Sequence, residues 1–137
     1  MVSLSTVQAS NALINSTLPA GLVAVFCGGT SGIGEATLFE FTKNAIRPKV
    51  YIVGRSQDAA NRNIAKCRMI NKNGDYRFVK ADLTLMNEVD AVCEQIKRQE
   101  KAVNILFLSQ GQSPAARTRK SSHILCFIDM SGNAGSN

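Results

Sequence analysis

The sequence predicts an α/β fold in which helices cover both faces of a doubly wound parallel sheet, truncated after about four strands. Three observations support this prediction. Apolar runs of strand length alternate with helix-like segments from residue 22 to residue 111. A glycine-rich turn joins the first strand to the first helix of this series. The alternation then stops: residues 113–122 are typical of a loop, and residues 129–137 consist mostly of Gly, Ser and Asn.

The first strand–helix unit follows a polar leader. Residues 1–21 contain small and polar side chains, and we expect a short helix around Ser5–Ile14. The unbroken apolar run Val23–Phe26 predicts a strand that is buried on both faces. A helix should follow from Ile33 to Asn44 and end before Arg47-Pro48. Its expected core-facing residues are Ile33, Thr37, Leu38, Phe41 and Ala45.

Two further units complete the pattern. Lys49–Val53 predicts the second strand, and Ser56 is a suitable N-cap for a helix from Gln57 to Ile70. Tyr76–Lys80 predicts the third strand, and Thr84 is expected to cap a helix that ends near Glu100. The apolar stripe of this third helix is Leu85, Val89, Val92, Cys93 and Ile96. Asn104–Ser109 predicts the fourth strand.

The chain therefore divides into a leader (1–21), an α/β domain of Rossmann-like type (22–111) and an irregular tail (112–137) that we expect to be partly disordered. The tail contains the apolar run His123–Ile128, which either adds an edge strand or stays exposed.

Composition narrows the choice of partners. The 137 residues are 45% apolar and 19% charged, which fits one globular domain, and no apolar run is long enough to span a membrane. The net charge of +6 comes from scattered side chains, so we expect no nucleic-acid partner. The four cysteines lack metal-ligand or disulfide spacing and fit buried thiols in the cytoplasm.

The glycine-rich turn has the spacing Gly-x-x-x-Gly-x-Gly. Gly28 allows a sharp turn, Gly32 allows a pyrophosphate to approach the backbone, and Gly34 allows close packing of helix on strand. The helix N-terminus then faces the anion. Glu35-Ala36 stands where a P-loop needs Lys followed by Ser or Thr, which excludes a nucleotide triphosphatase. A glycine turn without a ligand is the alternative.

This stretch resembles the Thr-Gly-x-x-x-Gly-Ile-Gly pattern of the short-chain dehydrogenase/reductase family, with Cys27 in place of the usual Thr. The resemblance covers residues 22–111 and implies a nicotinamide dinucleotide cofactor and a small-molecule substrate. Thr30 and Ser31 offer hydroxyl groups to that cofactor, and Ile33 belongs to the same motif. Three segments, 22–25, 53–56 and 106–109, look most like fungal members that act in secondary metabolism.

Arg55 indicates which dinucleotide is bound. It follows the second strand, 21 positions after Gly34, where an NAD site usually carries a carboxylate. Its planar cation suits the 2′-phosphate of NADP(H). The alternative is an ordinary surface arginine.

The ends of the third and fourth strands supply the remaining expected site residues. In the resembled family, the residue at Asp82 hydrogen-bonds the adenine and the residue at Leu83 lies along its ring, although Asp82 also fits a simple turn. Leu108-Ser109-Gln110-Gly111 stands where the family has Asn-Asn-Ala-Gly, and only Gly111 matches. We expect cofactor contacts from Ser109 and Gly111 through the backbone.

No catalytic residue is expected in this chain. The family uses a Ser and a Tyr-x-x-x-Lys pair on a helix, beyond the fourth strand. Tyr76 and Lys80 have that spacing, but on a strand such positions are about 13 Å apart. His123, the single histidine, has no evident partner. We also expect no metal site.

The sequence thus predicts an NADP-dependent oxidoreductase by resemblance, which moves a hydride to or from a small carbonyl or alcohol and which looks truncated and inactive as written. Two alternatives stay open. One is a non-catalytic NADP-binding module that associates with itself or with a full-length homologue. The other is a non-functional remnant with exposed apolar edges.

Overall fold

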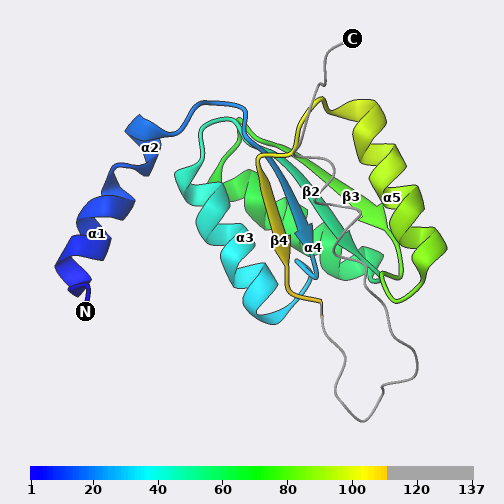
Figure 1. Ribbon diagram of the computed structural model, residues 1–137. Helices are drawn as coiled ribbons and strands as arrows, with labels where there is room; N and C mark the ends of the chain where they lie inside the picture. The colour runs from blue at the N-terminus through cyan, green and yellow to red at the C-terminus, as the bar shows by residue number, and fades with distance from the viewer. Residues whose placement is uncertain (111–137) are drawn as a thin grey trace.

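The computed structural model describes residues 1–110 (Figure 1). Gly111 and the tail 112–137, including His123–Ile128, lie outside the described residues. The elements in chain order are α1 (Leu4–Ala12), α2 (Ile14–Thr17), β1 (Val23–Cys27), α3 (Gly32–Asn44), β2 (Lys49–Gly54), α4 (Gln57–Ile70), β3 (Asp75–Lys80), α5 (Met86–Gln99) and β4 (Ile105–Leu108).

The four strands form one parallel sheet in the order β3-β2-β1-β4. Val25 of β1 pairs with Tyr51 of β2 on one side and with Leu106 of β4 on the other. The order moves outward from β1 to β3 and then crosses back to β4. This is the predicted doubly wound α/β fold, and it brings all four carboxyl ends to one edge of the sheet.

Helices cover both faces of the sheet, with α3 and α5 on opposite sides (Figure 1). Alternate strand residues face each layer. Leu38 of α3 and Cys67 of α4 pack on one face, against a strand set of Ala24, Phe26, Val50, Ile52 and Tyr76. Four residues of α5 pack on the other face: Val89, Val92, Cys93 and Ile96. The core therefore has two layers separated by the sheet.

Three sequence predictions about the helix starts are wrong. Ile33 is 78% exposed and Leu85 is 47% exposed, so neither faces the core. Both lie at the beginning of a helix, beyond the carboxyl edge of the sheet, where no strand remains to cover them. Thr84 does not cap α5; Leu85 holds the N-cap position, and the Thr84 hydroxyl donates to Asp82 Oδ1 at 2.7 Å. The Thr84 hydroxyl is therefore part of the turn at Asp82 and makes no capping hydrogen bond with α5.

The leader forms α1 and α2, which project away from the sheet (Figure 1). Neither helix contains a buried residue. Ser3 caps α1 by accepting a hydrogen bond from the Thr6 amide at 3.2 Å. No helix among residues 1–110 combines the length and the apolar character that a membrane span requires.

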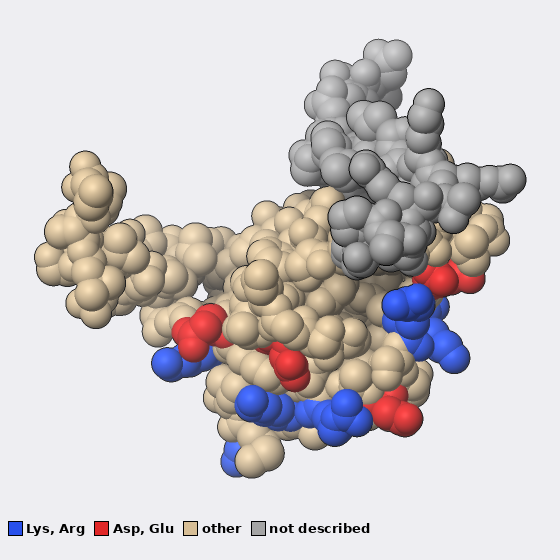
Figure 2. All heavy atoms as spheres, turned by 90° about the horizontal axis from the view of Figure 1, so that it is seen from below, with Lys and Arg blue, Asp and Glu red and all other residues tan. Residues whose placement is uncertain are grey.

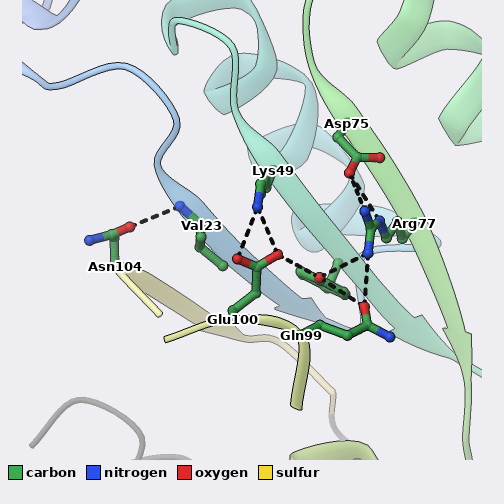
Figure 3. Close-up of polar contacts among 8 residues, drawn as sticks. Val23, Lys49, Asp75, Arg77, Gln99, Glu100 and Asn104 are labelled. Carbon is green, nitrogen blue, oxygen red and sulfur yellow. Dashed lines mark hydrogen bonds and ion pairs between the residues drawn. The ribbon is translucent and has the colours of Figure 1, made fainter. Parts of the chain in front are cut away.

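A polar cluster ties α5 to the amino ends of β2 and β3 (Figure 3). The Glu100 carboxylate, 7% exposed, accepts from Lys49 Nζ at 3.1 and 3.2 Å and from the Tyr51 hydroxyl at 2.8 Å. Gln99 Oε1 accepts from Tyr51 and from Arg77, which also pairs with Asp75. This cluster lies at the edge of the sheet opposite to the glycine-rich turn, so it supports the fold and not that turn.

Candidate dinucleotide site

The glycine-rich turn follows β1 at the carboxyl edge of the sheet. Gly28 has φ +86° and Gly32 has φ +58°, in the left-handed region that favours glycine. A Cβ at Gly28 would lie 2.8 Å from the Gln110 amide nitrogen. A Cβ at Gly34 would lie 2.3 Å from the Gly28 carbonyl oxygen. The backbone of α3 thus approaches the turn as closely as the spacing of the glycines predicts.

Hydrogen bonds hold this turn from two neighbouring strands. The Gly28 amide donates to the Val53 carbonyl of β2 at 3.1 Å. Ser109, directly after β4, donates from its hydroxyl to the Gly28 carbonyl at 3.2 Å and from its amide to the Cys27 carbonyl at 2.9 Å. Ser109 therefore supports the turn through its side chain, which is a different contact from the backbone contact to a cofactor that the sequence predicts.

The turn leads into the N-terminus of α3. Ser31 is the N-cap residue, with extended backbone (φ −161°) and no hydrogen bond from its side chain to the helix. The amide groups of the first helical turn, at Gly32, Ile33 and Gly34, face away from the helix and have no partner within it. Ile33 is exposed beside them. A helix start of this kind attracts an anion.

The end of β2 places Arg55 next to the turn. Thr30 lies against Gly54, because a Cβ at Gly54 would stand 3.1 Å from Thr30 Cγ2. Arg55 is exposed, and among residues 1–110 its guanidinium makes no hydrogen bond. Ser56 caps α4 as predicted, accepting from the Ala59 amide at 3.3 Å. Within the described part of the chain, Arg55 thus presents an exposed guanidinium that no hydrogen bond or ion pair holds.

The end of β3 contributes a compact turn. Asp82 Oδ1 accepts from the Thr84 amide at 3.0 Å and from the Thr84 hydroxyl. These bonds, with a smaller effect of Arg55, lower the pKa of Asp82. The Asp82 amide donates to the Glu88 carboxylate of α5. Leu83 is half-buried and packs against the α5 layer of the core.

An open cleft of about 510 Å³ lies between the β3 end and α5. Arg55, Lys80, Asp82 and Glu88 line it, so basic and acidic groups share one opening. Figure 2 views the molecule from below Figure 1, the side toward which the strands run, and shows basic and acidic side chains interspersed on this face. The structure therefore brings Arg55 and Asp82 to one cleft, and Gly28, Gly34 and Ser109 into mutual contact.

Sequence reasoning missed one residue of this site. Asn63 of α4, 4% exposed, donates from its side-chain amide to the Gly29 carbonyl at 3.1 Å. The signal in the sequence is a polar residue on the face of α4 that otherwise carries Ala60 and Cys67. A buried amide needs a partner, but the sequence does not show which one.

The two tyrosines offer no acid or base at the carboxyl edge. Burial is the main reason that the pKa values of Tyr51 and Tyr76 are raised to about 12. Tyr76 and Lys80 both lie on β3, and the Tyr76 hydroxyl donates to the Asn71 carbonyl at 2.9 Å. Their spacing is therefore that of a strand, as the sequence analysis argued.

Comparison with known proteins agrees with this geometry. The family model described as short chain dehydrogenase matches residues 22–126. Oxidoreductase AN1596 of Emericella nidulans is 43% identical over 111 residues, 81% of this chain and 33% of its own length. This chain spans about a third of the length of the curated relatives it matches.

Two solved structures show the same fold. An L-sorbose reductase from Gluconobacter frateurii, solved with NADPH and L-sorbose, superposes with a TM-score of 0.66 at 20% identity, over 81% of this chain and 46% of that one. A short chain oxidoreductase from Pseudomonas aeruginosa PAO1, solved with NADPH and described as containing an atypical catalytic center, gives 0.59 at 26% identity over 69% and 37%. The chain belongs to the short-chain dehydrogenase family.

Proposed function

We propose that this chain binds NADP(H) at the carboxyl edge of its sheet. The glycine-rich turn and the start of α3 would hold the pyrophosphate, and Arg55 would hold the 2′-phosphate. Asp82 and Leu83 would hold the adenine, with Thr30, Ser31, Ile33, Ser109 and Gly111 completing the set. The turn fits such a group, since at Gly32, the first residue of α3, nothing lies within 4 Å of an added Cβ and the space beside the helix start is open.

One observation supports NADP(H) over NAD(H) above all others. Arg55 stands at the end of β2 with its cation uncommitted among the described residues, beside the cleft that contains Asp82. The neighbours Gly54 and Ser56 carry no carboxylate that would accept hydrogen bonds from a ribose 2′-hydroxyl. The Pseudomonas structure was solved with NADPH, which agrees with this choice.

We further propose that the enzyme to which this cofactor-binding half corresponds is an oxidoreductase, which moves a hydride to or from a small carbonyl or alcohol. Bound NADP(H) supplies the hydride chemistry. The described residues supply the cofactor half of such an enzyme: they bind and orient the dinucleotide. The general acid and the substrate pocket are not among residues 1–110, so activity of this chain alone is not part of the proposal. A role in secondary metabolism is part of this proposal, because segments 22–25, 53–56 and 106–109 look most like fungal members that act there. The similarity to a fungal oxidoreductase agrees with an oxidoreductase of that group.

Arg55→Asp tests the cofactor assignment. We expect the wild-type chain to bind NADPH more tightly than NADH, measured by isothermal titration calorimetry. The variant should lose about tenfold to a hundredfold in NADPH affinity, the value of one charge-assisted contact, and should bind NADH no more weakly.

Arg98→Asp is the matched control, because Arg98 is an exposed arginine in the last turn of α5, away from the carboxyl edge. It should leave both affinities unchanged. Equal losses in the two variants would show a general charge effect, and a wild-type chain that binds neither dinucleotide would refute the proposal.

A second candidate is a binding module that associates with another copy or with a full-length homologue. β4 is only four residues long, is half-buried along its length and has a neighbour on one side among residues 1–110. Such an edge can pair with another strand. The mass of the chain in solution tests this candidate.

A cytoplasmic setting is part of the proposal. Cys27, Cys67 and Cys93 are buried and form no disulfide with one another, and burial raises the pKa of the Cys27 thiol to about 12. Reduced thiols without a disulfide role are typical of that compartment.

A further inference from the structure

Asn63 is an unusual residue for its position. Few polar residues are buried among residues 1–110, and Asn63 is one of them, with 4% of its surface exposed. Its amide nitrogen donates to the Gly29 carbonyl, 34 positions earlier in the chain, at 3.1 Å. An apolar side chain at this position would pack against the sheet without the free-energy cost of burying an amide. The hydrogen bond to Gly29 therefore indicates a role for Asn63 beyond the packing of α4.

Three successive carbonyls of the glycine-rich turn are held by partners within the protein. Ser109 donates hydrogen bonds to the carbonyl oxygens of Cys27 and Gly28, at 2.9 and 3.2 Å. Asn63 donates a hydrogen bond to the carbonyl oxygen of Gly29. A carbonyl oxygen that faced a pyrophosphate would repel it, so a turn that binds an anion must direct its carbonyls elsewhere.

The Gly29 bond also orients the next amide. The C=O of Gly29 and the N–H of Thr30 belong to one planar trans peptide unit and point in opposite directions. Because Asn63 draws the carbonyl toward α4, the Thr30 N–H points away from α4. A side chain at Gly29 would crowd β1, since a Cβ there would lie 3.0 Å from Phe26 Cβ.

We propose that Asn63 is a positioning residue of the dinucleotide site: it fixes the Gly29–Thr30 peptide so that amide groups of the turn, and not carbonyls, face the pyrophosphate. This inference rests on the proposed function. It adds a residue from α4, the helix that begins directly after Arg55 and Ser56. Asn63 thereby joins the part of the site that would hold the pyrophosphate to the part that would hold the 2′-phosphate.

Asn63→Leu tests the proposal in the full chain, because leucine has a similar size and no donor. We measure the affinities for NADPH and for adenosine 2′-phosphate, which lacks the pyrophosphate. The variant should bind NADPH about tenfold more weakly, the effect of one lost hydrogen bond, and adenosine 2′-phosphate almost unchanged. Asn63→Gln, which keeps the donor, should recover part of the NADPH affinity.

Thr42→Val is the matched control. Thr42 is also a buried polar residue on a helix; it lies on α3 and donates to Cys67 Sγ at 3.6 Å, away from the turn. It should lower stability without changing the ratio of the two affinities.

Three outcomes would overturn the proposal. In the first, Asn63→Leu binds both ligands like wild type. In the second, it loses both affinities equally, with no recovery in Asn63→Gln. In the third, neither Asn63 variant folds, which would make Asn63 a determinant of folding. A wild-type chain that fails to bind NADPH would instead refute the proposed function.

Discussion

At the scale of single residues, Gly34 has the tightest surroundings in the candidate site. A Cβ there would lie 2.3 Å from the Gly28 carbonyl oxygen and 2.4 Å from the Ser109 hydroxyl oxygen. The hydroxyl can rotate, but the carbonyl belongs to the backbone and cannot move without the turn. The contact of α3 with the turn therefore depends on the absence of a side chain at this position.

Gly34→Ala should lower the free energy of unfolding by about 1–3 kcal/mol, the usual cost of overpacking. It should also abolish NADPH binding, because the turn must shift. Urea unfolding and calorimetric titration measure the two effects.

Gly21→Ala serves as its control. Gly21 has φ +80° but nothing within 4 Å of a Cβ, so alanine there costs about 1 kcal/mol of backbone strain and should leave NADPH affinity intact. A Gly34→Ala chain that binds NADPH normally would contradict the account of the close contact.

At the scale of elements, the polar cluster joins the end of α5 to the sheet (Figure 3). Burial, followed by the hydrogen bond to Glu100, raises the pKa of Tyr51 to about 12. Burial likewise raises the pKa of Tyr76 to about 12. Folding therefore favours the neutral phenol. The resulting stabilisation is complete below the ordinary pKa of about 10 and is lost as the pH rises toward 12.

The ultraviolet absorbance of tyrosinate tests this directly, because the chain contains only two tyrosines. We expect both to ionise well above pH 10, and Tyr51→Phe should remove half of the change in absorbance. Circular dichroism at each pH checks that the chain is still folded. If either tyrosine ionises near pH 10 in the folded chain, the burial and the contacts described for that side chain are wrong.

The element scale also shows why some sequence predictions failed. The apolar periodicity of α3 and α5 identified the faces with Leu38 and Val92 correctly, because the stripe follows the 3.6-residue repeat. It assigned Ile33 and Leu85 to the same faces, yet both are exposed. Apolar periodicity indicates which face of a helix packs on the core, but it does not indicate where the sheet beneath that helix ends.

At the scale of the whole molecule, β4 forms an edge of the sheet that residues 1–110 build. Its four residues are half-buried, and β1 is its neighbour among residues 1–110. If the chain associates, this edge is the expected contact, since unpaired backbone groups can extend a sheet.

Sedimentation velocity across a range of concentrations tests the association. We expect a species heavier than the 14.8 kDa monomer, and Leu106→Lys should shift the distribution toward the monomer, because an edge lysine disfavours pairing. Lys101→Ala, a change at an exposed residue between α5 and β4, should have no effect. A wild-type chain that is monomeric at every concentration would exclude the binding-module candidate in its self-associating form.

Local sequence patterns were enough to predict the fold class, the strand and helix segments and the glycine turn, because apolar runs, helical periodicity, caps and glycine spacing are signals within a few residues. The strand order β3-β2-β1-β4 and the partners of the turn depend on how the chain packs in three dimensions. Asn63 reaches Gly29 across 34 positions, and Ser109 reaches Gly28 across 81. Such pairs form only after the crossovers have brought the strand ends together, so no pattern within a few residues predicts them.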